Sequence, residues 1–549
     1  MSSEKFSATL SIGDLNDYIA PSQGCVVSFK ANSNSNPKPS TSSCSSRLDK
    51  SYAGNSAKLG SAIKPLETEP VKISLNDCLA CSGCITSSKT VMLEKKSLDE
   101  FLSNINKGKA VIVSVSPQSR ASLGVAFGLS PLQASLFSYV FKKLTTLFKA
   151  LGVKAVFDTS CSRDLTLIES CYEFITRYRQ CHSTTDKKSK LGLPLISSAC
   201  PAWINYAEKN LGSYILPNIS SVKSPQQIIG AIIKNHICQM LYQRPEDIYH
   251  VTVMPCYDKK LEAVRDAFVF QLDAQGEKIV EVDSVLTTVE LLDLIKVIFD
   301  FFKCMVPSPL SPSSITLSKT FLQAFVLLWL FSPGKWVVAD VWTFIDMLPE
   351  FDFLQSKSVD FASLEELPLD NLLTNLDDGN LLYGVRGSSG GYAETIFRYA
   401  AKNLFGKEIV GPLNFKTIRN PNFQEVTLEV EGETVLKFAL CYGLQNLIQV
   451  VKKIDSGECE YQFLEIMACP SAGCLNGGGQ IKRKPGESVQ SLELKYMENV
   501  IEADPFENPI IKGLYTEWLD QPGSEKATKY MHTEYHPRVK SRTSQLQDW

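Results

Sequence analysis

Short apolar runs alternate with helical stretches along most of the chain after residue 109. Five runs rich in β-branched residues are typical of strands, at 110–117, 153–160, 193–201, 249–256 and 461–470. Helix candidates lie between them, among them 130–151 and 224–241. Apolar strands separated by helices predict a parallel α/β sheet whose two faces are covered by helices. Residues 425–442 instead predict a β-hairpin around Glu431, Gly432 and Glu433, followed by a helix.

Two stretches break this pattern. Residues 31–66 are rich in Ser, Asn, Pro and Lys, with hardly any apolar periodicity, which indicates a flexible linker. Residues 297–356 are very apolar and aromatic, punctuated by Pro and Ser. Their longest nearly apolar run, from Phe321 to Phe331, is shorter than the roughly 20 residues that a membrane-spanning helix needs. We therefore interpret 297–356 as a buried or aggregation-prone insert and expect no membrane contact.

Composition narrows the function further. Lys and Arg total 56 against 59 Asp and Glu, so the net charge of −3 gives no reason to expect nucleic-acid binding. The polar N-terminus shows no secretory signal. The chain has 16 Cys and only 5 His. In a reducing compartment, clustered cysteines favour a metal site or catalysis over disulfides.

Three of the predicted strands end near a cysteine, at Cys200, Cys256 and Cys469. Ligands of open parallel sheets bind at the carboxyl ends of the strands, so these thiols could surround one cavity at the switch point of the sheet. Cys474 follows in the Gly-rich segment ACPSAGCLNGGGQ, where backbone N–H groups could approach sulfide. The four thiols would supply a complete ligand set for an iron–sulfur cluster. Alternatively, each could be a small core residue, because unpaired cysteines are often buried.

The sharpest motif in the chain is Cys78, Cys81 and Cys84, a CxxCxxC run. This spacing wraps a compact loop around a cubane cluster, as in bacterial ferredoxins. The fourth cysteine of that motif is Ser88 here, so another segment must supply the last thiolate. We expect Cys25, with Cys44 as the competitor. Zinc is the rival metal, although its sites usually pair two CxxC knuckles.

Four segments resemble the signature segments of iron-only hydrogenases, in the same order: SSACPAW, MPCYDKKLEA, GSSGGYAE and MACPSAGCLNGGGQ. The tail NPIIKGLYTEWLDQPGSEKATKYMHTEY resembles the small-subunit segment of that family. DLNDYIAPSQGC before CLACSGC is similar to the Nar-type, or prelamin-A-recognition-factor-like, branch of cytosolic iron–sulfur assembly factors. The resemblance implies an α/β fold of iron-only hydrogenase-like parallel sheets flanked by helices, with a small N-terminal iron–sulfur segment.

The resemblance also implies two 4Fe-4S clusters. One would be held by Cys25, Cys78, Cys81 and Cys84, and the other by Cys200, Cys256, Cys469 and Cys474. The organisation expected is a ligand-supplying segment at 1–30, the linker at 31–66, a ferredoxin-like segment at 67–100, a hydrogenase-like core at 101–490 and a helical tail at 491–549.

The function implied by this branch is delivery of iron–sulfur clusters to cytosolic and nuclear apoproteins, together with a targeting complex that includes a WD-repeat protein. Trp549, after the acidic Asp548, is similar to the terminal aromatic with which the family docks on that machinery. The implied location is the cytoplasm, with the nucleus as a second site.

A hydrogenase-like redox enzyme is the alternative function. Hydrogenases have a proton-relaying cysteine directly before the first ligand, and Ala199 stands there in this chain. Alanine cannot carry out acid–base relay, which favours an assembly factor without hydrogenase activity. Lys259 matches a lysine that hydrogenases place against the active cofactor, and here it could balance the negative charge of a cluster.

Two features depart from the family pattern. The last two ligands, Cys469 and Cys474, are spaced C-x4-C instead of C-x3-C, so an added residue, Ala472 or Gly473, is expected to bulge out. The stretch 297–356 has no counterpart, and joining 293–296 directly to 356–368 would give an ordinary passage from helix to loop.

Overall fold

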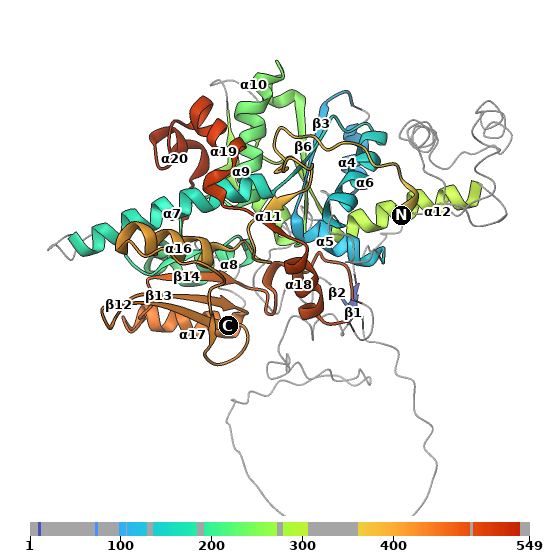
Figure 1. The fold of residues 1–549 in the computed structure, drawn as a ribbon. Helices are drawn as coiled ribbons and strands as arrows, with labels where there is room; N and C mark the ends of the chain where they lie inside the picture. The colour runs from blue at the N-terminus through green and yellow to red at the C-terminus, as the bar shows by residue number, and fades with distance from the viewer. Residues whose placement is uncertain are drawn as a thin grey trace, which may run out of the picture. The chain divides into compact units, whose positions relative to one another are not determined.

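The computed structural model describes residues 9–11, 72–74, 98–105, 107–128, 136–183, 192–271, 278–305, 361–483 and 487–538 (Figure 1). The chain divides into two compact units, Met1–Ile85 and Thr86–Trp549. In the smaller unit, strand β1 (Thr9–Ser11) pairs antiparallel with β2 (Lys72–Ser74). This pairing joins the two segments that flank the predicted linker.

The first sheet of the larger unit is fully parallel. Its strands lie in the order β4-β3-β6-β9, with bounds β3 (Ala110–Val115), β4 (Ala155–Asp158), β6 (Ile248–Met254) and β9 (Ser284–Thr287). Side chains of a strand alternate between its two faces. Val111 and Val113 accordingly belong to one hydrophobic cluster, and Ile112 between them belongs to another. Both faces of this sheet are therefore buried.

Helices pack on each face of the first sheet. On the side of Val111 the cluster draws residues from α4 (Leu98–Ile105), α5 (Pro117–Ala126), α6 (Leu136–Ala150) and α12 (Thr288–Met305). On the side of Ile112 it draws residues from α7 (Ser160–Ser183), α9 (Pro225–Ile232), α19 (Pro509–Leu514) and α20 (Glu525–Met531). The C-terminal tail thus completes this core, and Figure 1 shows α19 and α20 beside α9.

The second sheet is mixed. Its order is β11-β12-β13-β14-β5, with bounds β5 (Leu195–Ser197), β11 (Lys416–Thr417), β12 (Phe423–Val430), β13 (Glu433–Tyr442) and β14 (Phe463–Met467). Strands β13, β14 and β5 are parallel, whereas β11, β12 and β13 are antiparallel. The predicted hairpin is confirmed as β12–β13. The predicted helix after it is α17 (Leu444–Asp455).

The expected α/β fold with parallel sheets flanked by helices is confirmed, but the five predicted strands are divided between two sheets instead of forming one. Strands β3, β4 and β6 form the first, while β5 and β14 pair with each other in the second. Helices α7 and α16 (Tyr392–Phe405) pack on one face of the second sheet, and α17 packs on the other (Figure 1). The five predicted strands are largely buried on both faces, so periodicity alone could not assign pairing partners.

The remaining described elements are short. They include α8 (Pro201–Tyr206), α10 (Cys238–Met240), α11 (Asp258–Ala263), α18 (Val489–Glu498) and strands β7 (Val269–Phe270), β8 (Ile279–Val280), β10 (Tyr383–Gly384) and β15 (Ile501–Glu502). Turns of 3-10 or π helix lie between several of them.

Helix α12 extends into the first residues of the apolar insert 297–356. It continues past position 297, and Ile298 and Phe299 are buried in the same cluster as Leu291 and Leu294. Residues 306–356 lie outside the described residues. No helix in the described part of the chain combines the length and apolar character needed to span a membrane.

Candidate functional site

Four cysteines come from the carboxyl ends of strands in both sheets. Cys256 follows β6 of the first sheet, and Cys200 follows β5 of the second. Cys469 and Cys474 follow β14 of the second sheet. The predicted strand-end placement is therefore confirmed, but the predicted switch point of a single sheet is wrong. The thiols meet where two sheets end.

The electrostatics of the thiols show that they are neighbours. Burial, followed by Asp258, Cys469 and Cys200, raises the pKa of Cys256 well above its ordinary value. Burial and then the proximity of Cys200 raise the pKa of Cys474 to about 12. Each of these groups is harder to ionise because another cysteine lies close. A ligand of high positive charge is what would hold such thiols as thiolates.

Cys200 sits at the start of α8, directly before Pro201. Burial raises the pKa of its thiol, whereas the backbone N–H groups of Ala468, Trp203 and Ala202 lower it. These amides would stabilise a thiolate at this position. The hydroxyl of Ser198 accepts from the N–H of Cys200 at 3.1 Å and donates to the carbonyl of Ile466, which ties the end of β5 to β14.

Cys256 and Lys259 lie within one turn at the start of α11. The thiol of Cys256 donates to Asp258 at 3.4 Å. The buried ammonium of Lys259 contacts Glu262 Oε2 at 2.7 Å and Ser224 Oγ at 3.0 Å. Its charge also lowers the pKa of Cys474. The lysine thus lies close enough to the thiols to offset negative charge there.

The loop from Cys469 to Cys474 accommodates its extra residue through left-handed backbone. Ser471, Ala472 and Gly473 have φ of 45°, 50° and 48°. Ala472 is only 6% exposed and joins the hydrophobic cluster of the first sheet. The methyl group of Ala472 is thus directed into the core, and the bulge expected to let both thiolates reach one cluster stays a prediction.

The glycines after Cys474 allow close packing against the end of β6. A Cβ on Gly477 would lie 2.3 Å from the carbonyl oxygen of Pro255, and one on Gly479 would lie 2.8 Å from Thr287. Their N–H groups donate to the carbonyls of Cys474 at 3.2 Å and Pro255 at 3.0 Å, respectively. These two amides are committed to backbone carbonyls, so the expectation that they approach sulfide is wrong for them.

Ser389 is a site residue that sequence reasoning missed, although its segment GSSGGYAE was singled out. Its hydroxyl accepts from the N–H of Cys474 at 3.1 Å and donates to the carbonyl of Ala472 at 3.4 Å. The only sequence signal was the serine between glycines, which does not reveal its partner.

The donor set is of the kind that iron–sulfur clusters use. Thiolates are the ligands of such clusters, and amides and hydroxyls around the sulfurs tune them. The four thiols from strand ends and the backbone amides near Cys200 fit the implied cluster in kind. Within the described ranges, no three or more Cys, His, Asp or Glu side chains are arranged to hold one metal ion.

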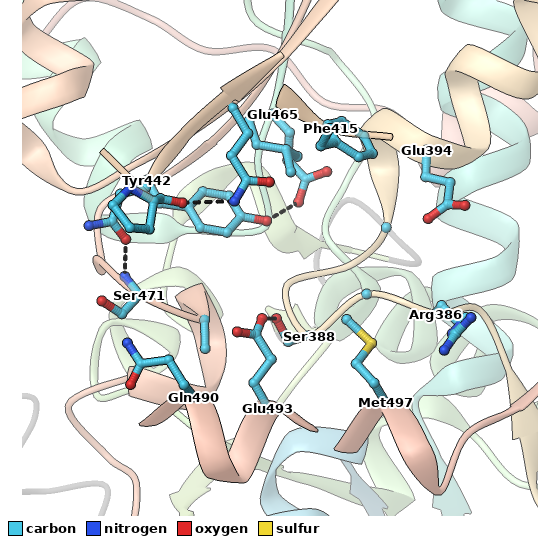
Figure 2. Close-up of a pocket in the computed structure, with 17 residues that line it drawn as sticks. Arg386, Ser388, Glu394, Phe415, Tyr442, Glu465, Ser471, Gln490, Glu493 and Met497 are labelled. Carbon is cyan, nitrogen blue, oxygen red and sulfur yellow. Dashed lines mark hydrogen bonds between the residues drawn. The ribbon is translucent and has the colours of Figure 1, made fainter. Parts of the chain in front are cut away.

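A cavity of about 310 Å³ is lined in part by Ser471 and Ala472 (Figure 2). Tyr442 and Glu465 line it from the second sheet, and Glu493 lines it from α18. The hydroxyl of Tyr442 donates to Glu465 at 2.7 Å, as Figure 2 shows. Burial raises the pKa of Glu465.

Several predicted residues lie outside the described residues. They are the N-terminal set Cys25, Cys78, Cys81 and Cys84, the competitor Cys44, and Trp549. Ala199 is described, and its methyl group packs between two hydrophobic clusters of the second sheet.

Comparisons with known proteins show the family to which this fold belongs. The family described as "Iron only hydrogenase large subunit, C-terminal domain" matches residues 109–478, and "Iron hydrogenase small subunit" matches 498–538. A solved FeFe-hydrogenase structure aligns with a TM-score of 0.59 at 25% identity, covering 80% of this chain and 98% of that one. The chain belongs to the iron-only hydrogenase-like family.

The curated relatives carry a more particular description. "Protein NAR1" of Arabidopsis thaliana is 55% identical, with 100% of both chains covered. "Cytosolic iron-sulfur assembly component 3" of Mus musculus is 37% identical over 97% of this chain and 96% of its own. "Probable cytosolic Fe-S cluster assembly factor narfl" of Dictyostelium discoideum is 36% identical, covering 99% and 98%.

Proposed function

We propose that this protein is a cytosolic iron–sulfur cluster assembly factor that holds two 4Fe-4S clusters and helps to deliver clusters to cytosolic and nuclear apoproteins. The observation that carries the proposal is the convergence of Cys200, Cys256, Cys469 and Cys474 at the ends of two sheets, in a chain whose relatives are named assembly factors. A cluster bound there supplies electron-transfer and cluster-exchange chemistry.

Neighbouring residues favour cluster binding by the C-terminal ligand set, Cys200, Cys256, Cys469 and Cys474, in three ways. The amides of Ala202, Trp203 and Ala468 favour the thiolate of Cys200. Lys259 offsets negative charge beside Cys474. The packed glycine loop holds Cys474 against the end of β6. Each contribution stabilises the thiolates that would bind a cluster.

The first ligand set is proposed to be Cys25, Cys78, Cys81 and Cys84. The pairing of β1 with β2 supports it, because it brings the chain before Cys25 alongside the chain before Cys78 despite the intervening linker. Partners proposed for the protein are client apoproteins and a targeting complex with a WD-repeat protein, bound through Trp549.

Hydrogenase activity is not part of the proposal. Ala199 has no group that can take or give a proton at the position directly before Cys200. The names of the relatives, which describe assembly, point the same way.

The test is anaerobic reconstitution with iron and sulfide. The wild type should bind about eight irons as two four-iron clusters, and each of Cys81→Ala and Cys474→Ala should lose about half of them. Cys441→Ala is the matched control, because Cys441 is a buried thiol on β13 with no ligand role here. Stoichiometric zinc without sulfide, or full iron content in Cys474→Ala, would contradict the ligand assignment. Hydrogen evolution by the reconstituted protein would contradict the assembly function.

A further inference from the structure

We infer that Ser389 is a positioning residue that fixes Cys474 at the proposed cluster site, which rests on the proposed function. Ser389 belongs to the loop between β10 and α16, 85 residues before Cys474. It is 2% exposed, so its hydroxyl is shielded from water and serves contacts within the protein.

The hydroxyl of Ser389 is hydrogen-bonded to the backbone on both sides of Gly473. It accepts from the N–H of Cys474 at 3.1 Å and donates to the carbonyl of Ala472 at 3.4 Å. A hydroxyl offers one donor and two acceptor positions, so it can hold the amide and the carbonyl together. Ser389 therefore fixes where Cys474 lies.

The backbone is shaped to let this contact form. Gly473, directly before Cys474, has φ of 48°, and a Cβ on it would lie 1.9 Å from Ser389 Oγ. The hydroxyl therefore occupies the space that any other side chain at position 473 would need. The close approach holds the loop between Cys469 and Cys474 in its left-handed conformation.

Tyr442 and Glu465 support the segment that follows Ser389. Tyr442 donates to Glu465 Oε1 at 2.7 Å, and Glu465 Oε2 accepts from the N–H of Ala393 at 2.8 Å, at the start of α16. These contacts tie two strands of the second sheet to the helix that begins three residues after Ser389.

Ser389→Ala removes the hydroxyl that accepts from the Cys474 N–H, so the Cys474 backbone is no longer fixed. The reduction potential and paramagnetic-resonance spectrum of the C-terminal cluster should therefore differ from those of the wild type, because the groups around the ligands tune such clusters. Loss of such a supporting contact typically weakens metal binding by about 10- to 100-fold. We expect at least roughly tenfold faster iron loss to a chelator on that scale.

The matched control is Ser388→Ala. Ser388 is the neighbouring serine, 3% exposed, and its hydroxyl donates to Glu493 at 2.8 Å instead of contacting Cys474. This variant should keep the wild-type potential and rate of iron loss. Ser389→Thr retains the hydroxyl and should restore the potential toward the wild-type value. The measurements use the full chain in the Cys81→Ala background, so that only the C-terminal cluster contributes.

A potential and an iron-loss rate that are the same in Ser389→Ala and Ser388→Ala would overturn the inference. If Ser389→Ala does not fold, Ser389→Cys takes its place, because a thiol is a weaker acceptor for the Cys474 N–H, and should lose iron faster than Ser388→Cys. Equal rates in these two variants would again overturn the inference. The proposed function fails separately, when Cys474→Ala keeps all of its iron whatever Ser389 does.

Discussion

The two sheets of the larger unit contribute differently to the thiol site. The first sheet is entirely parallel, buried on both faces, and supplies one cysteine, Cys256. The second is mixed, has a hairpin with exposed positions on β12, and supplies Cys200, Cys469 and Cys474. The first sheet thus forms the buried frame of the site. The segments that follow β5 and β14 of the second sheet carry three of the four cysteines.

The sheets also differ in how they hold charge. Arg120 and Asp158 form a buried ion pair at the end of β4, and His250 is buried in the middle of β6. Around the second sheet, pairs such as Lys402 with Glu408 on the side of α16 are largely exposed, and none of its five strands carries a histidine. Removing charge at these positions of the first sheet should therefore cost more stability than removing the exposed pair beside the second.

The largest effect is expected from Arg120→Ala. It leaves the carboxylate of Asp158 buried without its cation, which typically costs about 3–5 kcal/mol of unfolding free energy. The control Lys402→Ala removes an exposed pair at 3.2 Å and should cost about 0–1 kcal/mol. Denaturant unfolding measures both. Equal losses would show that the two regions do not differ in this respect.

His250 should make the first sheet acid-sensitive. Burial lowers the pKa of this imidazole from 6.5 to about 4. As the pH falls through that interval the unfolded chain gains a proton that the folded chain does not, so stability falls, by up to about 3 kcal/mol. His250→Asn should lose this component, while the exposed His182→Asn serves as the surface control.

The measurement for His250 is the midpoint of denaturant unfolding at several pH values between 7 and 4. The difference between wild type and variant cancels other buried groups, including Glu281, whose pKa burial raises to about 7. Parallel pH profiles for wild type and His250→Asn would contradict the assignment.

Gly473→Ala tests the loop that carries Cys474. The new methyl group would meet Ser389 in a left-handed backbone, and crowding of this kind typically costs about 1–3 kcal/mol. We expect lower stability together with lower iron content of the C-terminal set. A variant that keeps full iron content would mean that the loop can relax away from Ser389.

The smallest effect is expected from Gly432→Ala in the hairpin of the second sheet. Gly432 has φ of 88° and open space where a Cβ would stand, so only the backbone strain of about 1 kcal/mol applies. Gly513→Ala in α19 is the counterpart, because it has open space without the positive φ and should stabilise by about 0.4–1 kcal/mol. Thermal unfolding at fixed protein concentration distinguishes the two.

Much of the fold could be predicted from the chain itself. The strands near 110–117 and 249–256, the helix within 130–151 and the hairpin around Gly432 depend on local periodicity and on turn chemistry. The strand-end cysteines followed from the same patterns. These features are local, so each is fixed by residues close together in the sequence.

The tertiary structure alone decided how these parts combine. The assignment of β5 and β14 to a second sheet, and of Cys256 to the first, depends on pairing between segments far apart in the chain. The inward placement of Ala472 depends on the core of the first sheet, and the role of Ser389 depends on a contact across 85 residues. Such contacts form only when distant surfaces pack, and a one-dimensional pattern of apolar and polar residues does not encode which surfaces meet.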